Sequence, residues 1–173
     1  MGLRRSINGG LAGGIAAALW AAQQPLDKRV FRSGYDDVEL LGKAIVKGDD
    51  WPAAGLALHV ANGIAVGAAY AQLRRFMPGP AVAQGTGLAV AEHVALWPLV
   101  ALVERHHPRR RELARLGGNP AAFWQGLYRH ALFGLAMSIV EAKLNTDPDD
   151  DEPTPVPVSS NGHGDVKLAV GAA

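Results

Sequence analysis

Four long stretches of apolar and small residues alternate with charged segments along the chain. They cover residues 7–25, 52–73, 82–103 and 120–142, and none of them contains Lys or Asp. Helices of this length, at about 1.5 Å per residue, cross a hydrocarbon core of roughly 30 Å. The pattern therefore predicts an all-α fold, a four-helix transmembrane bundle formed by residues 1–144.

A soluble four-helix bundle is the alternative, and it requires a polar stripe along every helix. The second stretch offers few polar side chains over its whole length, namely His59, Asn62, Tyr70 and Gln72. This pattern favours the membrane. The first stretch, preceded by Arg4 and Arg5, also has features of a secretory signal. Because three more spans follow, we expect it to be a retained helix.

Two segments outside the spans have patterns of their own. Residues 36–47 carry apolar positions at helical spacing, with acidic residues first and lysines last, which predicts a short amphipathic helix on the membrane surface. Residues 145–173 combine prolines with an acidic block and lack aromatic residues. Such a segment cannot bury enough apolar surface to fold, so it predicts a disordered tail.

Composition and charge exclude several classes of protein. The chain of 173 residues has no Cys, which excludes disulfides, cysteine-ligated zinc and a cysteine nucleophile. Its formal net charge of +1 gives no support for nucleic-acid binding. Hydrophobic residues make up 49%, and the 21 glycines indicate closely packed helices.

The two halves of the chain resemble each other weakly. Trp20 and Trp97 follow the same Ala-Leu pair and differ by 77 in residue number. His59 and His130 each precede a glycine by four residues and differ by 71. Two repeated helical hairpins are therefore a hypothesis, with chance similarity of Ala-rich helices as the alternative.

Positive charge is distributed unequally between the two ends of the predicted bundle. The linkers after the first and third spans hold ten Lys and Arg residues, against five near the other ends of the spans. The positive-inside rule places these two linkers in the cytoplasm. Arg4 and Arg5 before the first span argue for the reverse orientation.

Ionisable and polar residues inside the spans are the candidate site, because such residues are costly in a bilayer and face the bundle interior. They are His59, Asn62, Glu92, His93, Gln125, Arg129 and His130. We expect Glu92 to pair with Arg129, with the three histidines nearby.

Three interpretations of this cluster stay open: a buried network that fixes helix packing, a path for protons or ions, and a metal site of His59, His93, His130 and Glu92. Glu92 and His93 are adjacent, about 100° apart on a helix, and so chelate one ion poorly. We therefore predict no metal ion and no cofactor, and we find no catalytic motif.

Two further groups of residues suggest contacts. Glycines at GxxxG spacing predict close helix packing within the bundle, with a homo-oligomer interface as the alternative; they are Gly9, Gly10, Gly13, Gly14, Gly63 and Gly67. The basic segment after the third span predicts contact with anionic lipid, or a topology signal, through Arg105, Arg109, Arg110 and Arg111.

The segments GGLAGGIAAALW, LHVANGIAVGAAY and GTGLAVAEHVALWPL resemble the YagU-like family of small bacterial inner-membrane proteins. The resemblance covers residues 1–144 and implies a multi-pass protein of the bacterial inner membrane. It implies no reaction. We expect a structural, lipid-associated or partner-binding role, with proton or ion translocation as the alternative.

Overall fold

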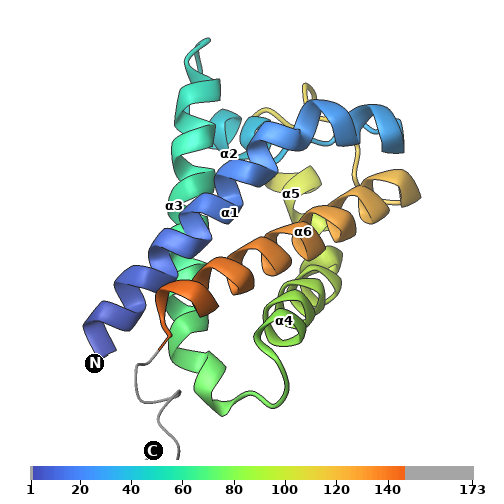
Figure 1. Ribbon diagram of the computed structural model, residues 1–173. Coiled ribbons are helices and arrows are strands. Elements are labelled where there is room, and N and C mark those ends of the chain that lie inside the picture. Colours follow the sequence, from blue (N-terminus) through green and yellow to red (C-terminus); the bar gives the residue numbers. More distant parts are fainter. Residues whose placement is uncertain (1, 147–173) are drawn as a thin grey trace, which may run out of the picture.

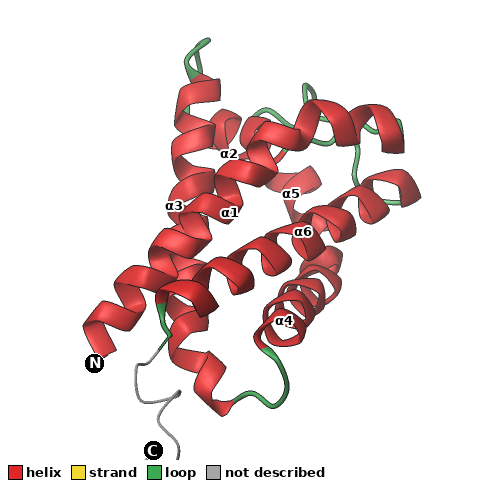
Figure 2. Ribbon diagram, viewed as in Figure 1, coloured by secondary structure: helices red, strands yellow, loops and turns green. Residues whose placement is uncertain are grey.

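The computed structural model describes residues 2–146, and every regular element within that range is helical (Figure 2). Six α-helices follow one another, and two short 3₁₀ turns, Arg74–Phe76 and Trp97–Leu99, extend α3 and join α4 to α5. The α-helices are α1 (Gly2–Phe31), α2 (Asp37–Ile45), α3 (Trp51–Leu73), α4 (Ala81–Leu96), α5 (Val100–His106) and α6 (Pro120–Leu144).

The long helices form a bundle in which α1 lies between α3 and α6, and α6 lies between α1 and α4 (Figure 1). The linkers 32–50 and 107–119 lie at the same end of the bundle. At the other end, the Asn8 amide donates to the Leu144 carbonyl at 2.8 Å and to the Asn145 side chain at 2.9 Å. The start of α1 and the end of α6 are therefore joined.

The first predicted span is longer than expected, and the third is interrupted. α1 does not stop near Pro25 but continues to Phe31, where Arg32 takes a left-handed conformation (φ 51°) and ends the helix. The third span is not one helix, because Pro98 lacks an N–H and its ring crowds the preceding turn. The chain forms a 3₁₀ turn there and resumes as α5.

The short helix predicted at 36–47 is α2, and its start is fixed by a side-chain cap. The Asp36 carboxylate accepts the Glu39 amide at 2.9 Å, which satisfies one of the free N–H groups of the first turn. Gly42 of α2 and Gly55 of α3 come so close that a Cβ on either one would collide with backbone. α2 is therefore held directly against α3.

Two helical segments, Trp51–Phe76 and Ala81–His106, are long and apolar enough to cross a membrane. In the second, only 11% of the most apolar window is buried, so most of its apolar surface faces outward. The predicted spans 7–25 and 120–142 lie in helices that are less apolar. Of the predicted tail 145–173, residues 147–173 lie outside the described part of the chain.

Candidate binding cavity and buried ion-pair network

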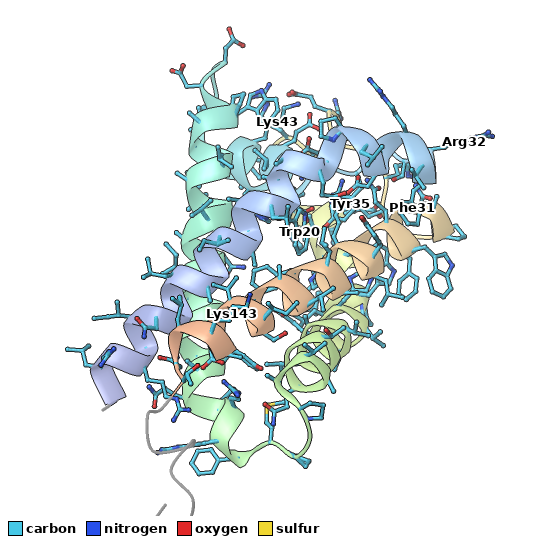
Figure 3. All side chains as sticks on the ribbon, viewed as in Figure 1. Trp20, Phe31, Arg32, Tyr35, Lys43 and Lys143 are labelled. Atoms are coloured by element: carbon cyan, nitrogen blue, oxygen red, sulfur yellow. The ribbon has the colours of Figure 1, made fainter. Side chains whose placement is uncertain are left out.

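A cavity of about 250 Å³ lies among α1, α2, α3, α4 and α6. Trp20, Trp97 and Phe133 contribute aromatic walls, and Figure 3 shows Trp20 and Tyr35 in the space between α1 and α6. The polar lining consists of Tyr35, Asp37, His59, Asn62, Glu92, His93 and His130. Five of the seven predicted site residues therefore line one cavity.

Arg129 does not line this cavity but is fully buried beside it, in an ion-pair network with Asp27 and the part-buried Asp37. Its guanidinium donates to both carboxylate oxygens of Asp27, from Nε and Nη2, each at 2.6 Å. Nη1 donates to Asp37 at 2.7 Å, and the Gln125 amide donates to Asp27 at 2.7 Å. Two carboxylates thus share one guanidinium, which leaves the network with an excess of negative charge.

The predicted Glu92–Arg129 pair is therefore wrong. Arg129 pairs with Asp27 because α1 continues past Pro25 and carries Asp27 into the bundle, where it is 1% exposed. Glu92 instead lines the cavity, half-buried, and has no ion-pair partner among the described residues. Its charge is free to act on whatever occupies the cavity.

Asp37 and the residues before α2 form the polar end of the cavity. Asp37 accepts the Tyr35 hydroxyl at 2.5 Å and the Trp20 indole N–H at 3.1 Å. Burial, with the carboxylate of Asp37 beside the hydroxyl, raises the pKa of Tyr35 well above its ordinary value. Burial would raise the pKa of Asp36 too, but hydrogen bonds from Lys28 and the Glu39 amide lower it overall. Asp36 is consequently ionised at neutral pH, and Tyr35 remains a phenol.

Two of the three histidines, His59 and His130, pack against Trp20, while His93 packs against His130 at 4.7 Å between ring centroids. The Trp20 ring packs edge-on against His59 at 5.1 Å and against His130 at 4.9 Å, between ring centroids. His93 Nε2 lies 3.1 Å from the Phe123 carbonyl and His130 Nδ1 lies 2.8 Å from the Gly126 carbonyl. Because a carbonyl only accepts, each of these two nitrogens carries a proton and donates it to the carbonyl.

His59 Nε2 is buried and has no hydrogen-bond partner among the described residues. Within the described residues no group of three His, Asp or Glu side chains lies close enough to hold a metal ion. The insertion of the Trp20 ring between His59 and His130 gives the physical reason. The metal-site interpretation of the histidines therefore has no geometric support.

The predicted packing glycines of α1 lie on two faces of the helix, and only one of these faces meets Gly63 and Gly67 of α3. A Cβ on Gly63 would lie 2.5 Å from the Ala17 Cβ and 2.7 Å from the Gly13 oxygen, so the backbones of α1 and α3 touch here. Gly9 and Gly67 make the same kind of approach one turn further along. Gly10 and Gly14 instead face the Ile64 side chain and line an apolar surface groove.

The α4–α6 pair repeats the close approach of the α1–α3 pair. Gly134 approaches Gly85 and Ala89 as Gly63 approaches Gly13 and Ala17. Gly13 and Ala17 of α1 correspond to Gly85 and Ala89 of α4, 72 residues later. Gly63 of α3 corresponds to Gly134 of α6, 71 residues later, and the same shift of 71 relates His59 to His130. The offset of 77 suggested by the two tryptophans does not fit these contacts.

A second buried ion pair closes the other end of the bundle. Glu141 is fully buried and accepts from Arg74 at 2.6 Å and from Asn145 at 2.9 Å. Between this pair and the cavity lies the apolar core, composed of Ala12, Ala16, Ala17, Trp20, Tyr70, Ala89, Phe133 and Met137. The polar residues at the two ends are thus separated by packed apolar side chains.

The predicted lipid-contact arginines have unequal surroundings. Arg109 forms a two-point ion pair with Glu112, at 2.5 and 2.8 Å, and also donates to the Lys47 carbonyl. Arg105 is exposed on α5. Arg110 and Arg111 line a second cavity together with Arg115, which is not one of the predicted lipid-contact residues.

Comparisons with protein-family models, with curated proteins and with solved structures find no match to this chain.

Proposed function

We propose that this chain is a multi-pass protein of the bacterial inner membrane whose four long helices cross the bilayer and whose cavity binds a small organic cation. The distribution of side chains supports the membrane part. Large apolar residues are exposed along α1 at i, i+4 spacing, at positions Leu3, Ile7, Leu11, Ile15 and Leu19. The fully buried side chains include Asp27, Gln125, Arg129 and Glu141. An apolar exterior around an interior that holds charged and polar side chains is stable in lipid and costly in water.

The absence of cysteine makes the topology testable by single-cysteine labelling with a membrane-impermeant maleimide. If all four long helices span, Asp49→Cys and Gly118→Cys react from one side of the membrane, and Gly79→Cys reacts from the other. The positive-inside rule places Asp49 and Gly118 in the cytoplasm. Labelling of all three positions from the same side of sealed vesicles contradicts the four-span arrangement.

The ligand part of the proposal is supported by the uncompensated negative charge at the cavity. Glu92 has no ion-pair partner in the described part of the chain, and the neighbouring network has two carboxylates for one guanidinium. Trp20 and Trp97 also line the cavity, and an aromatic ring attracts a cation placed above its plane. A volume of about 250 Å³ suits a small molecule.

The same geometry favours binding over translocation. A proton or ion path needs polar groups or water on both sides of the cavity. Toward the Glu141–Arg74 end, the described residues offer Ala12, Ala16 and Met137, which are packed and apolar. A cavity that is closed by packed apolar side chains toward that end binds a ligand without passing it on.

The expected result is that benzylamine, a cation at neutral pH, raises the unfolding temperature of the purified protein and changes its tryptophan fluorescence. Benzyl alcohol has nearly the same shape without the charge and should bind at least about tenfold more weakly. Glu92→Gln should weaken benzylamine binding about tenfold, since it removes the free carboxylate.

Asp49→Asn is the matched control, because it removes one negative charge from an exposed linker position outside the cavity. It should bind benzylamine as the wild type does. The cation proposal is wrong if benzyl alcohol binds as tightly as benzylamine, or if Glu92→Gln and Asp49→Asn bind it equally.

A further inference from the structure

A second cavity, of about 400 Å³, lies beside the 107–119 linker at the cytoplasmic end of the proposed topology. Arg110, Arg111 and Arg115 contribute its positive charge. Its apolar wall consists of Leu40, Val103, Leu113, Ala114 and Leu116. The cavity therefore combines a cationic group of side chains with an apolar surface.

The linker that carries these arginines is held in place by hydrogen bonds. The Glu104 carboxylate accepts the amides of Leu116 at 2.6 Å and Gly117 at 2.9 Å, which closes the linker back onto α5. The His107 ring bridges α2 and the linker, with Nε2 3.0 Å from the Leu40 carbonyl and Nδ1 accepting the Arg109 amide. The backbone around the three arginines is thus fixed before any ligand arrives.

Charge at this cavity is not balanced by the protein. Glu112 is paired with Arg109 and Lys43. Glu104 is the one carboxylate among the lining residues; its Oε1 accepts two backbone amides, and its single negative charge opposes three arginine charges. Among the described residues, Arg110, Arg111 and Arg115 form no ion pair. Three guanidinium groups with planar N–H donors are therefore available for an anion, and phosphate oxygens match that geometry.

We infer that this cavity binds the phosphate group of an anionic phospholipid, through Arg110, Arg111 and Arg115. The inference rests on the membrane placement proposed above and is independent of the cation site. A free phosphate would need only the arginines. The apolar wall at Leu40, Leu113 and Leu116 fits a ligand that carries hydrocarbon next to its phosphate.

The test compares two charge-matched variants of the full chain. The cavity variant carries Arg110→Gln, Arg111→Gln and Arg115→Gln; the control carries Arg29→Gln, Arg32→Gln and Lys47→Gln. All three control positions are exposed and lie at the same end of the bundle, so both variants lose three positive charges there. Circular dichroism and the unfolding temperature establish that each variant is folded.

Binding is measured by native mass spectrometry in detergent with phosphatidylglycerol, phosphatidylcholine or inorganic phosphate. We expect the wild type and the control variant to retain phosphatidylglycerol, and the cavity variant to bind it at least about tenfold more weakly. Phosphatidylcholine should bind more weakly than phosphatidylglycerol to the wild type, and millimolar phosphate should not displace the lipid.

Equal loss of phosphatidylglycerol in the two variants would show that only the general positive charge matters, and would overturn the inference. Binding of inorganic phosphate at least as tight as that of phosphatidylglycerol overturns the lipid assignment. A failure of the membrane proposal is seen separately, because it appears in the cysteine-labelling pattern rather than in the difference between these variants.

Discussion

Replacing Arg129 by methionine is expected to lower the free energy of unfolding by about 3–5 kcal/mol. The side chain is fully buried and is the partner of Asp27, which is itself 1% exposed. Methionine fills most of the volume but leaves Asp27 and Asp37 without their cation. The cost is therefore mainly that of leaving the buried Asp27 carboxylate, and the part-buried Asp37 carboxylate, without a cation.

Three comparisons make this prediction specific to the network. Arg129→Lys keeps the charge but loses the two-point contact with Asp27, so it should fall between the wild type and Arg129→Met. Arg105→Met removes an exposed arginine and should stay within about 0.5 kcal/mol of the wild type. The double variant Asp27→Leu, Arg129→Met should recover part of the loss, because one uncompensated charge has also been removed.

Reversible unfolding of the purified protein by SDS, followed by circular dichroism, gives these free energies. If Arg129→Met is no less stable than Arg105→Met, the network does not stabilise the bundle. A loss in the double variant equal to the sum of the two single losses would show that Asp27 and Arg129 act independently.

The apolar pattern predicts most of the helical architecture because it reports which segments avoid water. The stretches at 52–73 and 120–142 form α3 and α6 with nearly the expected bounds. The pattern cannot report where a helix ends when apolar and charged residues alternate at that point. Pro25 predicts a helix end, yet α1 passes through it.

Asp27 could have been found from spacing once α1 was extended. Trp20, Gln24 and Asp27 follow one another at i, i+4 and i+7, which places them on one helix face, and all three are buried. Interpreted as part of a charged linker, Asp27 has no partner. On the buried face of α1, the Asp27 carboxylate requires a buried cation as its partner. Arg129 supplies that cation, because its side chain is fully buried.

The gathering of His59, His93 and His130 followed from their depths in the spans, but their roles did not. Which nitrogen of each ring is occupied depends on carbonyls, such as those of Phe123 and Gly126, that a pattern of side chains does not reveal. Asp37 and Tyr35 complete the cavity from a linker, where polar residues are usual and give no signal.

Replacing Gly13 by alanine is expected to destabilise the bundle by about 1–3 kcal/mol, because the added methyl group meets fixed backbone. A Cβ at Gly13 would lie 3.0 Å from the Gly67 Cα and still closer to the Gly63 carbonyl. The two helices must separate to admit it. That separation also weakens the packing of Ala17, one turn away on α1, against Gly63.

Gly87→Ala is the matched control, since Gly87 also lies inside a helix but a Cβ there has open space around it. It should stabilise the protein by about 0.5–1 kcal/mol, because alanine loses less backbone freedom than glycine on forming a helix. The same chemical change thus has opposite signs at the two positions, which SDS unfolding measures directly. Equal effects would mean that α1 and α3 do not meet at Gly13.

Gly14 lies on the outer face of α1, because it faces Ile64 and the surface groove rather than the backbone of α3. A monomer–dimer equilibrium that is altered by Gly14→Ala but not by Gly13→Ala would assign this outer face to oligomerisation.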